Sequence, residues 1–390
     1  MLIYNAKIVT MRGNDIEHGY IRTNGAKIAE IGEMSRLNIT PSENDYNAEG
    51  MTVYPGFIDA HCHLGAFEDG IGFEGDDGNE ETDPITPQLR AIDMINPADY
   101  CFTEAARGGV TTVLSGMGSA NPIGGTFAAL KTYGSKRIDK LIIKAPAAMK
   151  FALGENPKTV YNEKNQSPNT RMATAALIRE QLYKTKRYIE DKNAYTESIG
   201  TDDELAPPDY DIKCEALIPV LEGEIKAHFH CHRADDIFTA MRIAKEFKLD
   251  YVLIHATEGG LVADELAEEH SKCVIGPVFS DRCKPELKNQ TIENGARLHN
   301  AGVEFAICTD HPENPIQYLP IAAGLAIRGG LDERTALEAI TSKAAEICGI
   351  SDRVGTLEVG KDADMVLYKG KFYDVTSVPQ LVLVNGEIVK

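Results

Sequence analysis

The segment VYPGFIDAHCH, residues 53–63, joins an apolar run to two histidines that stand two positions apart. Pro55 and Gly56 interrupt the run, so we expect a strand that begins near Phe57 and ends at the histidines. Because successive side chains of a strand point to opposite faces, His61 and His63 share a face. Two imidazoles on one face at the end of a strand can supply half of the ligands of a metal site.

Both ends of the chain consist of short strand-like segments separated by tight turns. Asn24-Gly25 stands between segments 20–23 and 26–31, and Asn385-Gly386 stands between segments 381–384 and 387–389. An Asn-Gly pair between such segments is a strong hairpin signal. We therefore predict one small β domain built from residues 1–54 and residues 351–390.

The middle of the chain, residues 55–350, alternates apolar strand-like segments with helical ones. One helix is expected to open at Asn96-Pro97 and to end at Gly108-Gly109, and others are expected at 320–327 and 333–348. Repeated βα units predict a parallel sheet, either a closed barrel or a doubly wound sheet. The charged segment 167–219 indicates a helical insertion, and the acidic, glycine-rich segment 68–83 reads as a long mobile loop. Strands are expected at 110–114, 141–144, 225–230, 251–254, 273–275 and 303–307.

Side chains that can bind a metal stand at the ends of four strand-like segments. In barrel enzymes the chemistry is placed at the carboxyl ends of the strands. Histidine with carboxylate is the ligand set of a catalytic zinc-type site, which keeps one position open for water. The pattern predicts a divalent metal centre, with zinc as the expected ion. The strand-end residues are His61 and His63, then His228, His230 and His232, then His255, and finally Asp310 followed by His311.

Composition excludes some partners. The 390 residues are 43% hydrophobic and 25% charged, and the net charge of −19 argues against nucleic acid and anionic membranes as partners. Eight cysteines show no disulfide-framework spacing, and several lie in apolar runs, as free thiols of a reducing compartment do. No signal peptide and no apolar run long enough to span a membrane is visible. We expect a cytoplasmic protein that acts on a small molecule, and the sequence allows a homo-oligomer.

The order and spacing of these residues resemble the amidohydrolase superfamily of metal-dependent hydrolases. The resemblance rests on PGFIDAHCH at 55–63, on the later strand-end histidines, on Thr309-Asp310, and on the ending VGTLEVGKDADMV at 354–366. Finer detail is similar to the imidazolonepropionase-like and zinc-prolidase-like branch. The resemblance covers the chain outside the insertion. It implies an α/β fold, a TIM-like (β/α)8 barrel with a small composite β-sandwich formed by both termini.

The resemblance also implies how the ligands are divided. His61, His63, His255 and Asp310 are expected to bind metal. Relatives carry a His-x-His pair at the middle strand and use the first member, which corresponds to His230. His232 then lies near the substrate and is the alternative ligand, and His228 lies deeper in the strand.

Many relatives hold two metals joined by a carboxylated lysine or a glutamate. Lys150 is the first choice for this bridge and Glu155 the second, while a site with one metal is the third possibility. A lysine can bridge only as its carbamate, which needs a neutral amine and therefore a lowered pKa.

The activity implied is hydrolysis of a C–N amide bond, cyclic or peptide-like, by a metal-activated water. Asp310 would take the proton of that water and deliver it to the leaving nitrogen. The metal, or His255 or His232, would polarise the carbonyl oxygen. Arg171, Arg233 and His311 are candidates for contacting the substrate, the arginines by clamping a carboxylate.

Two other classes compete with this interpretation. A deaminase of the same superfamily usually has a glutamate a few residues after the middle-strand histidine, and here His230 is followed by Cys-His-Arg-Ala-Asp. A non-catalytic relative should lack ligands, whereas this chain keeps them. The substrate itself cannot be read from the sequence, because loop side chains decide specificity.

Overall fold

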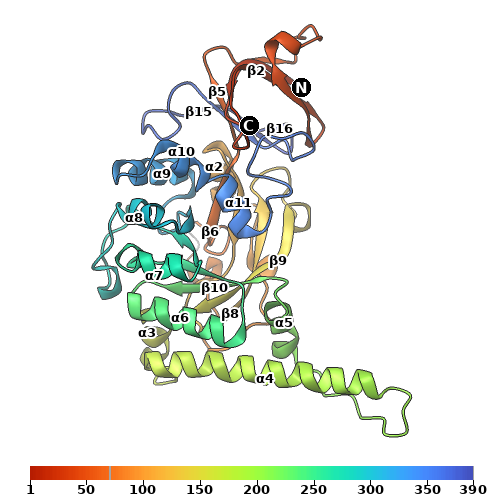
Figure 1. Cartoon of the computed structure of the whole chain (residues 1–390), viewed down its shortest axis with the longest axis vertical. Helices are drawn as coiled ribbons and strands as arrows, with labels where there is room; N and C mark the ends of the chain where they lie inside the picture. The colour runs from red at the N-terminus through yellow and green to blue at the C-terminus, as the bar shows by residue number, and fades with distance from the viewer. Residues whose placement is uncertain (70–71, 390) are drawn as a thin grey trace.

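Two eight-stranded sheets organise the chain, of which the computed structural model describes residues 1–69 and 72–389 (Figure 1). One sheet lies beside the two termini at the top of Figure 1 and takes strands from both ends of the chain. The other forms a nearly closed barrel in the middle, with helices around it. The protein is a mixed α/β structure, and the strands predicted to carry the site belong to the barrel.

The terminal sheet has the order β16-β15-β14-β5-β1-β2-β3, with β4 paired to β1. β5 joins the two ends of the chain, since it pairs with β1 and with β14. The hairpins predicted at Asn24-Gly25 and Asn385-Gly386 are confirmed as β2–β3 and β15–β16. The division into residues 1–54, 55–350 and 351–390 stays a proposal. The strands are β1 (Leu2–Ile8), β2 (Ile16–Asn24), β3 (Lys27–Glu33), β4 (Tyr46–Asn47), β5 (Thr52–Pro55), β14 (Met365–Tyr368), β15 (Pro379–Val384) and β16 (Glu387–Ile388).

The barrel strands follow one another in chain order from β6 to β13. β6 and β7 are buried at every position, as expected of strands that have helices on one side and barrel interior on the other. The strands are β6 (Phe57–Cys62), β7 (Val110–Ser115), β8 (Ile123–Lys131), β9 (Ile142–Ala152), β10 (Lys226–Cys231), β11 (Tyr251–His255), β12 (Lys272–Ile275) and β13 (Glu304–Ile307).

One strand departs from the (β/α)8 pattern that the sequence implied. β8 runs antiparallel to both β7 and β9, whereas the other neighbouring pairs in this sheet are parallel. Residues 116–122 and 132–141 are its only connections, and they hold no α-helix. A parallel neighbour needs a crossover of roughly a dozen or more residues, usually a helix, so connections this short favour an antiparallel strand.

A buried carboxylate, that of Asp59, links the first barrel strand, β6, to the residues that follow the last one, β13. Asp59 of β6 accepts hydrogen bonds from the backbone N–H of Thr309, at 3.1 Å, and from its hydroxyl, at 2.5 Å. The N–H of His63 donates to the carbonyl of His311 at 2.8 Å across the same seam. Burial raises the pKa of Asp59 to about 7, against these hydrogen bonds. The seam therefore places β6 and the residues after β13 side by side.

The helices cover the outside of the barrel. The helix expected at Asn96-Pro97 begins later, as α2, because Asn96 accepts the N–H of Ala98 in a turn while Asp99 caps Tyr100. Gly108 ends this helix as predicted. The predicted helix 333–348 divides into two at Thr341, whose backbone is not helical. The helices are α1 (Ala91–Met94), α2 (Tyr100–Arg107), α3 (Glu155–Glu163), α4 (Arg171–Ser198), α5 (Ile212–Leu221), α6 (Ala234–Phe247), α7 (Ala263–Glu268), α8 (Asn294–Ala301), α9 (Leu319–Arg328), α10 (Glu333–Glu338) and α11 (Ser342–Cys348).

Segment 167–219 contains the long helix α4 and most of α5. α4 begins after Thr170, whose hydroxyl accepts the N–H of Ala173. In Figure 1 this helix crosses the lower end of the molecule and extends beyond the barrel. Its first half is packed and its last turns are largely exposed, which explains the charged composition noted in the sequence.

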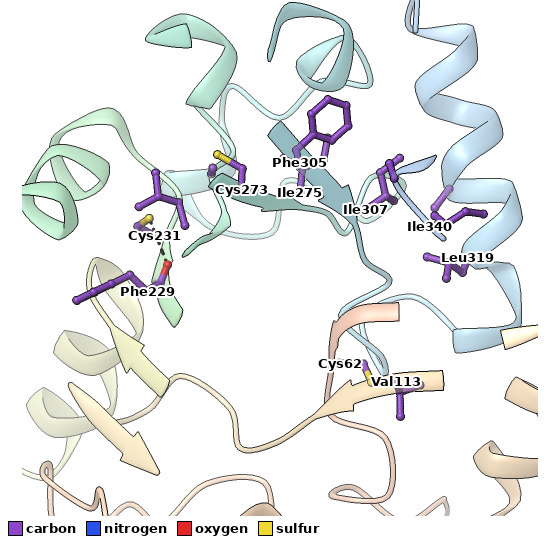
Figure 2. Close-up of a cluster of buried hydrophobic side chains, with 14 of the residues drawn as sticks. Cys62, Val113, Phe229, Cys231, Cys273, Ile275, Phe305, Ile307, Leu319 and Ile340 are labelled. Atoms are coloured by element: carbon purple, nitrogen blue, oxygen red, sulfur yellow. Dashed lines mark hydrogen bonds between the residues drawn. The ribbon is translucent and has the colours of Figure 1, made fainter. Parts of the chain in front are cut away.

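Alternation along β10 separates packing side chains from candidate site side chains. Phe229 and Cys231 lie in the hydrophobic layer between strands and helices, together with Ile275 of β12 and Ile307 of β13 (Figure 2). The rings of Phe229 and Phe151 stack with centroids 4.7 Å apart. His228, His230 and His232 alternate with these residues and therefore face the barrel interior.

A buried ion cluster ties the terminal sheet to the barrel. The ammonium of Lys131, at the end of β8, lies 2.9 Å from Asp362 and 2.5 Å from Asp364. Asp362 also pairs with Lys27 and Arg353. Because all three central side chains are almost fully buried, each charge depends on its partners.

The acidic segment expected as a loop contains a 3-10 turn at Gly72–Gly75 and lies against the loop that follows β7. The N–H of Gly118 donates to Gly78, and that of Ala120 donates to the Asn79 side chain at 3.1 Å. Residues 70–71 of this predicted loop lie outside the described residues. Within the described parts, no helix is both long and apolar enough to cross a bilayer. The cytoplasmic location and the homo-oligomer stay predictions.

Candidate metal centre

Three strand-end histidines lie near the carboxylate of Asp310, which follows β13. Oδ1 of Asp310 lies 3.2 Å from Nε2 of His63 and 3.7 Å from Nε2 of His61. Its Oδ2 lies 4.0 Å from Nδ1 of His255. One set of potential ligand atoms, from His61, His255 and Asp310, fits within 4.8 Å.

A second group of imidazoles stands at the ends of β10 and β11. Ligand atoms of His230, His232 and His255 also lie within 4.8 Å of one another. The rings of His232 and His255 are stacked at 4.7 Å, and that of His230 meets His255 edge-on at 4.6 Å. His255 thus belongs to both groups.

The backbone turns sharply where these side chains emerge. His255, Ala256 and Asp310 have φ values of 70°, 39° and 55°. This left-handed region costs free energy for residues other than glycine, and it persists only where the surroundings enforce it. At His255 and Asp310 it aims the side chains at each other directly after their strands end.

Hydrogen bonds fix which imidazole nitrogen is free. Nδ1 of His63 donates to the Gly116 carbonyl at 2.8 Å, and Nδ1 of His255 donates to the Gly276 carbonyl at 2.7 Å. A carbonyl can only accept, so each ring keeps its Nε2 lone pair for another partner. Metal-binding histidines are commonly oriented in this way.

Three imidazoles of the centre, those of His61, His230 and His255, are held neutral. Burial first, and neighbouring positive groups second, keep the pKa values of His61 and His230 well below the usual 6.5. Burial also lowers the pKa of His255 to about 4. Burial by itself raises the pKa of Asp310, yet His255, His63 and Lys150 outweigh it and lower that pKa. Neutral imidazole and ionised carboxylate are the states that bind a metal.

Lys150 of β9 lies inside the barrel beside the first group. Its Nζ is 3.4 Å from Nε2 of His61 and 5.7 Å from the ring centre of Phe127. In the described residues no carboxylate is within ion-pair distance of this ammonium, although the side chain is fully buried. Burial lowers its pKa to about 8, which favours the neutral amine more than at a surface lysine.

The donor set fits a divalent cation. Nδ1 of His61, Nδ1 of His230 and Oδ1 of Asp310 are buried and have no hydrogen-bond partner. Leaving buried polar atoms unpaired costs free energy. A bound cation would compensate the charge of the Asp310 carboxylate and would accept a lone pair from each imidazole. These residues could therefore hold a metal ion.

A cavity of about 320 Å³ opens onto the centre. His63, His230, His232, His255 and Asp310 are exposed to it, and loop residues complete its wall. The wall includes Phe67 and Asn79 from the acidic segment, Ser119, Asn156, Thr257, Lys284 and Gln290.

The structure does not bring the other predicted substrate contacts to this cavity. Arg171 pairs with Asp236 and Arg233 with Asp235, and neither arginine lines the cavity. His311 is buried beside the seam and also lies outside the lining residues. Glu155, the second choice for a bridge, starts α3, and its N–H donates to Glu286 at 3.0 Å. His228 pairs in register with Lys150, below the cavity, where burial lowers its pKa to about 3.

Sequence reasoning missed three polar side chains that stand outside the barrel strands. Thr257 fixes His232 by a 2.7 Å hydrogen bond between its hydroxyl and Nδ1. Asn156 has its amide nitrogen 3.4 Å from Nε2 of His230. Glu286 lies 3.7 Å from Nε2 of His232. Only Thr257 carried a signal, because it stands two residues after a strand-end histidine.

Comparisons with known proteins agree with this geometry. The model of the Amidohydrolase family matches residues 52–389. An amidohydrolase of known structure from Thermotoga maritima is 38% identical, with a TM-score of 0.93 over 100% of this chain and 99% of that one. An imidazolonepropionase of Phocaeicola vulgatus is 25% identical over 94% of this chain and 92% of its own.

A further curated relative is longer than this chain. The amidohydrolase tasK of Hapsidospora irregularis is 28% identical over 87% of this chain but only 36% of its own length. The chain thus spans about a third of that relative. The family match covers most of the chain, and the resemblance predicted from the sequence motifs is confirmed. The chain belongs to the amidohydrolase family of metal-dependent hydrolases that act on carbon–nitrogen bonds.

Proposed function

We propose that this protein hydrolyses a C–N amide bond of a small molecule with the help of a divalent metal, which we take to be zinc. The substrate classes considered are cyclic amides, N-acyl amino acids and dipeptides. One observation carries the proposal. A single ionised carboxylate, Asp310, lies within 4.0 Å of His61, His63 and His255 at the floor of a cavity.

His61, His63 and Asp310 would hold the metal on one side, and His230 and His255 on the other, with His232 as the alternative to His230. A divalent metal bound there supplies Lewis acidity and makes a water molecule acidic enough to be deprotonated near neutral pH. Two metals are proposed, and Lys150 is the residue proposed to join them.

Lys150 would bridge as its carbamate. In forming the carbamate, the neutral amine bonds to the carbon of carbon dioxide and loses one proton to solvent, which leaves a carbamate anion beside His61. The lowered pKa of Lys150 and the absence of a paired carboxylate in the described residues favour this chemistry.

Asp310 would act as the general base and then as the general acid. Its lowered pKa keeps it ionised at neutral pH, so it can accept the proton of the attacking water. It would then release that proton to the leaving nitrogen. His255 and His232, which line the cavity, would orient the carbonyl oxygen of the substrate.

Deamination of a nitrogen heterocycle is the second candidate. It would use the same metal and Asp310, but proton delivery would need a further acid on the β10 side. Glu286, 3.7 Å from His232, is the only carboxylate of the described residues paired with that histidine. It does not line the cavity, which makes this candidate the weaker one.

The test is a screen of the metal-loaded protein against cyclic amides, N-acyl amino acids, dipeptides and amino-substituted heterocycles. The products are followed as new amines or carboxylates and as free ammonia. We expect turnover of a carboxamide and no ammonia from heterocycles. Ammonia release without amide cleavage would replace the proposal by the deaminase, and no turnover of any class would reject both.

A further inference from the structure

Lys284 is a cation at the cavity wall that the chemistry above does not use. It follows β12, in the loop that contains the 3-10 turn η5 (Pro285–Leu287). Among the described residues that line the cavity, it is the only lysine or arginine. In a protein with a net charge of −19, this lysine gives the cavity wall a positive group that an anionic ligand could pair with.

Two groups hold this side chain in place. Its ammonium donates to Oδ1 of Asn156 at 2.8 Å and lies 3.1 Å from Oε1 of Glu286. No third acceptor is found in residues 1–69 and 72–389, whereas an ammonium has three hydrogens to donate. The side chain of Lys284 is 26% exposed, and that of Glu286 is 1% exposed. A ligand in the cavity therefore meets the ammonium, with Glu286 behind it.

The same partners place Lys284 close to the metal-binding histidines. Asn156 contacts Lys284 through its oxygen and lies 3.4 Å from His230 through its nitrogen. The same amide nitrogen of Asn156 donates a hydrogen bond to the hydroxyl of Ser119 at 2.7 Å, which fixes the orientation of the amide. One amide group therefore separates the ammonium from His230. A carboxylate of the substrate that pairs with Lys284 would therefore lie on the same side of the cavity as His230.

We propose that Lys284 binds a carboxylate of the substrate, so that the enzyme acts on amides that carry a carboxylate on the nitrogen side, as N-acyl amino acids and dipeptides do. This inference rests on the proposed hydrolysis and narrows its substrate class. Cyclic amides without a carboxylate and uncharged heterocycles would leave the third ammonium hydrogen unpaired. Between the ammonium and a carboxylate, opposite full charges add to the hydrogen bond, and a neutral amide supplies no such charge.

The experiment compares binding of matched pairs of ligands. N-acetyl derivatives of glycine, alanine, leucine, phenylalanine, proline and methionine are used as free acids and as primary amides. Their dissociation constants are measured by calorimetry on metal-loaded protein in an Asp310→Asn background, so that turnover does not interfere. We expect at least one acid to bind about tenfold or more tightly than its amide.

Lys284→Met should abolish this preference, and Lys284→Arg should retain part of it. Lys288→Met is the matched control, because Lys288 is exposed in the same loop and does not line the cavity. Lys284→Met leaves buried Glu286 without its cation, so the double variant Lys284→Met with Glu286→Gln removes both charges. The thermal transitions of all variants establish that they fold.

The outcomes separate this inference from the proposed function. A preference for acids that disappears in both Lys284→Met variants and survives in Lys288→Met supports the inference. Equal binding of acids and amides, no binding of any acid, or a preference that survives Lys284→Met overturns it. Amide turnover by the intact enzyme without any preference would refute the role of Lys284 alone. An acid preference in a protein that hydrolyses no amide would refute the proposed function alone.

Discussion

Asp310 gathers the chemistry of the site because of where the chain turns. Its left-handed backbone aims the carboxylate at His63 and His255. Asp59 fixes the preceding residue, Thr309, by accepting its hydrogen bonds. His61 and His255, held neutral by burial, keep lone pairs available. The result is one ionised carboxylate in contact with several neutral imidazoles.

Replacing Asp310 by asparagine should lower kcat by about a thousandfold, because general acid–base catalysis contributes on that order. The amide has nearly the same shape but cannot accept the proton of water. Metal content, measured by mass spectrometry, should remain close to that of the unchanged protein, since the histidines stay in place. Full activity of Asp310→Asn would contradict the role assigned to this residue.

Lys150 is proposed to decide how many metal ions the protein binds. The intact protein should bind two ions per chain, and Lys150→Ala should bind one, because the carbamate that would link them cannot form. Equilibrium dialysis with zinc measures both values. Lys186→Ala, in the exposed part of α4, is the control and should bind two. One ion per chain in the intact protein, unchanged by Lys150→Ala, would refute the bridge.

The strand-end histidines could be predicted from the sequence, but the loop residues of the cavity could not. Alternation along a strand places His61 and His63, or His230 and His232, on one face without knowledge of the rest of the fold. Lys284 lies in an irregular loop and Asn156 in the first turn of α3, far apart in the chain. Only folding brings them to 2.8 Å. Arg171 and Arg233 pair instead with Asp236 and Asp235 and do not line the cavity.

Among the elements, β8 was expected neither as a strand nor in its antiparallel direction. Apolar composition indicates a buried strand but carries no information about its direction. The length of the connections does, and residues 132–141 are too short to hold a crossover helix. β8 then ends at Lys131, beside the aspartates that precede β14. The reversed strand thus supplies the cation that joins the barrel to the terminal sheet.

Lys131→Met should destabilise the protein by about 3 kcal/mol, because removal of one partner leaves buried charges uncompensated. Asp362 keeps Lys27 and Arg353, so the loss falls mainly on Asp364. Urea unfolding followed by circular dichroism measures the change. Lys140→Met, an exposed lysine near the start of β9, should be neutral. Equal stability of the two variants would contradict the role of the cluster.

The same ion cluster should make the free energy of unfolding depend on pH. Burial alone would raise the pKa of Asp362, but Lys131, Lys27 and Arg353 together lower it below its usual 3.8. The stabilisation is therefore complete above that unfolded-state value and is lost as the pH falls through the lower folded-state pKa. Asp362→Asn should be less stable at pH 7, and the difference from the unchanged protein should shrink below about pH 4. A difference that stays constant from neutral to acidic pH would exclude this coupling.

In the whole molecule, the two ends of the chain meet in one sheet, and the barrel between them carries the candidate site. The hairpin signals of both termini were local and could be read directly. Their association could not be derived from either hairpin alone, because β5 pairs with strands from opposite ends. The similar texture of the two termini suggested one β domain and the family resemblance implied the same, and strands from both ends lie in one sheet.

The account as a whole depends on the strand-end residues forming a metal centre that hydrolyses amides. Protein stripped of metal should be inactive on the amide found by the screen, and hydrolysis should return in proportion to the zinc bound. His63→Gln should lose both metal and activity, whereas His299→Gln, at an exposed helix position paired with Asp332, should behave as the unchanged protein. Undiminished hydrolysis by the metal-free protein, or by His63→Gln, would contradict the account.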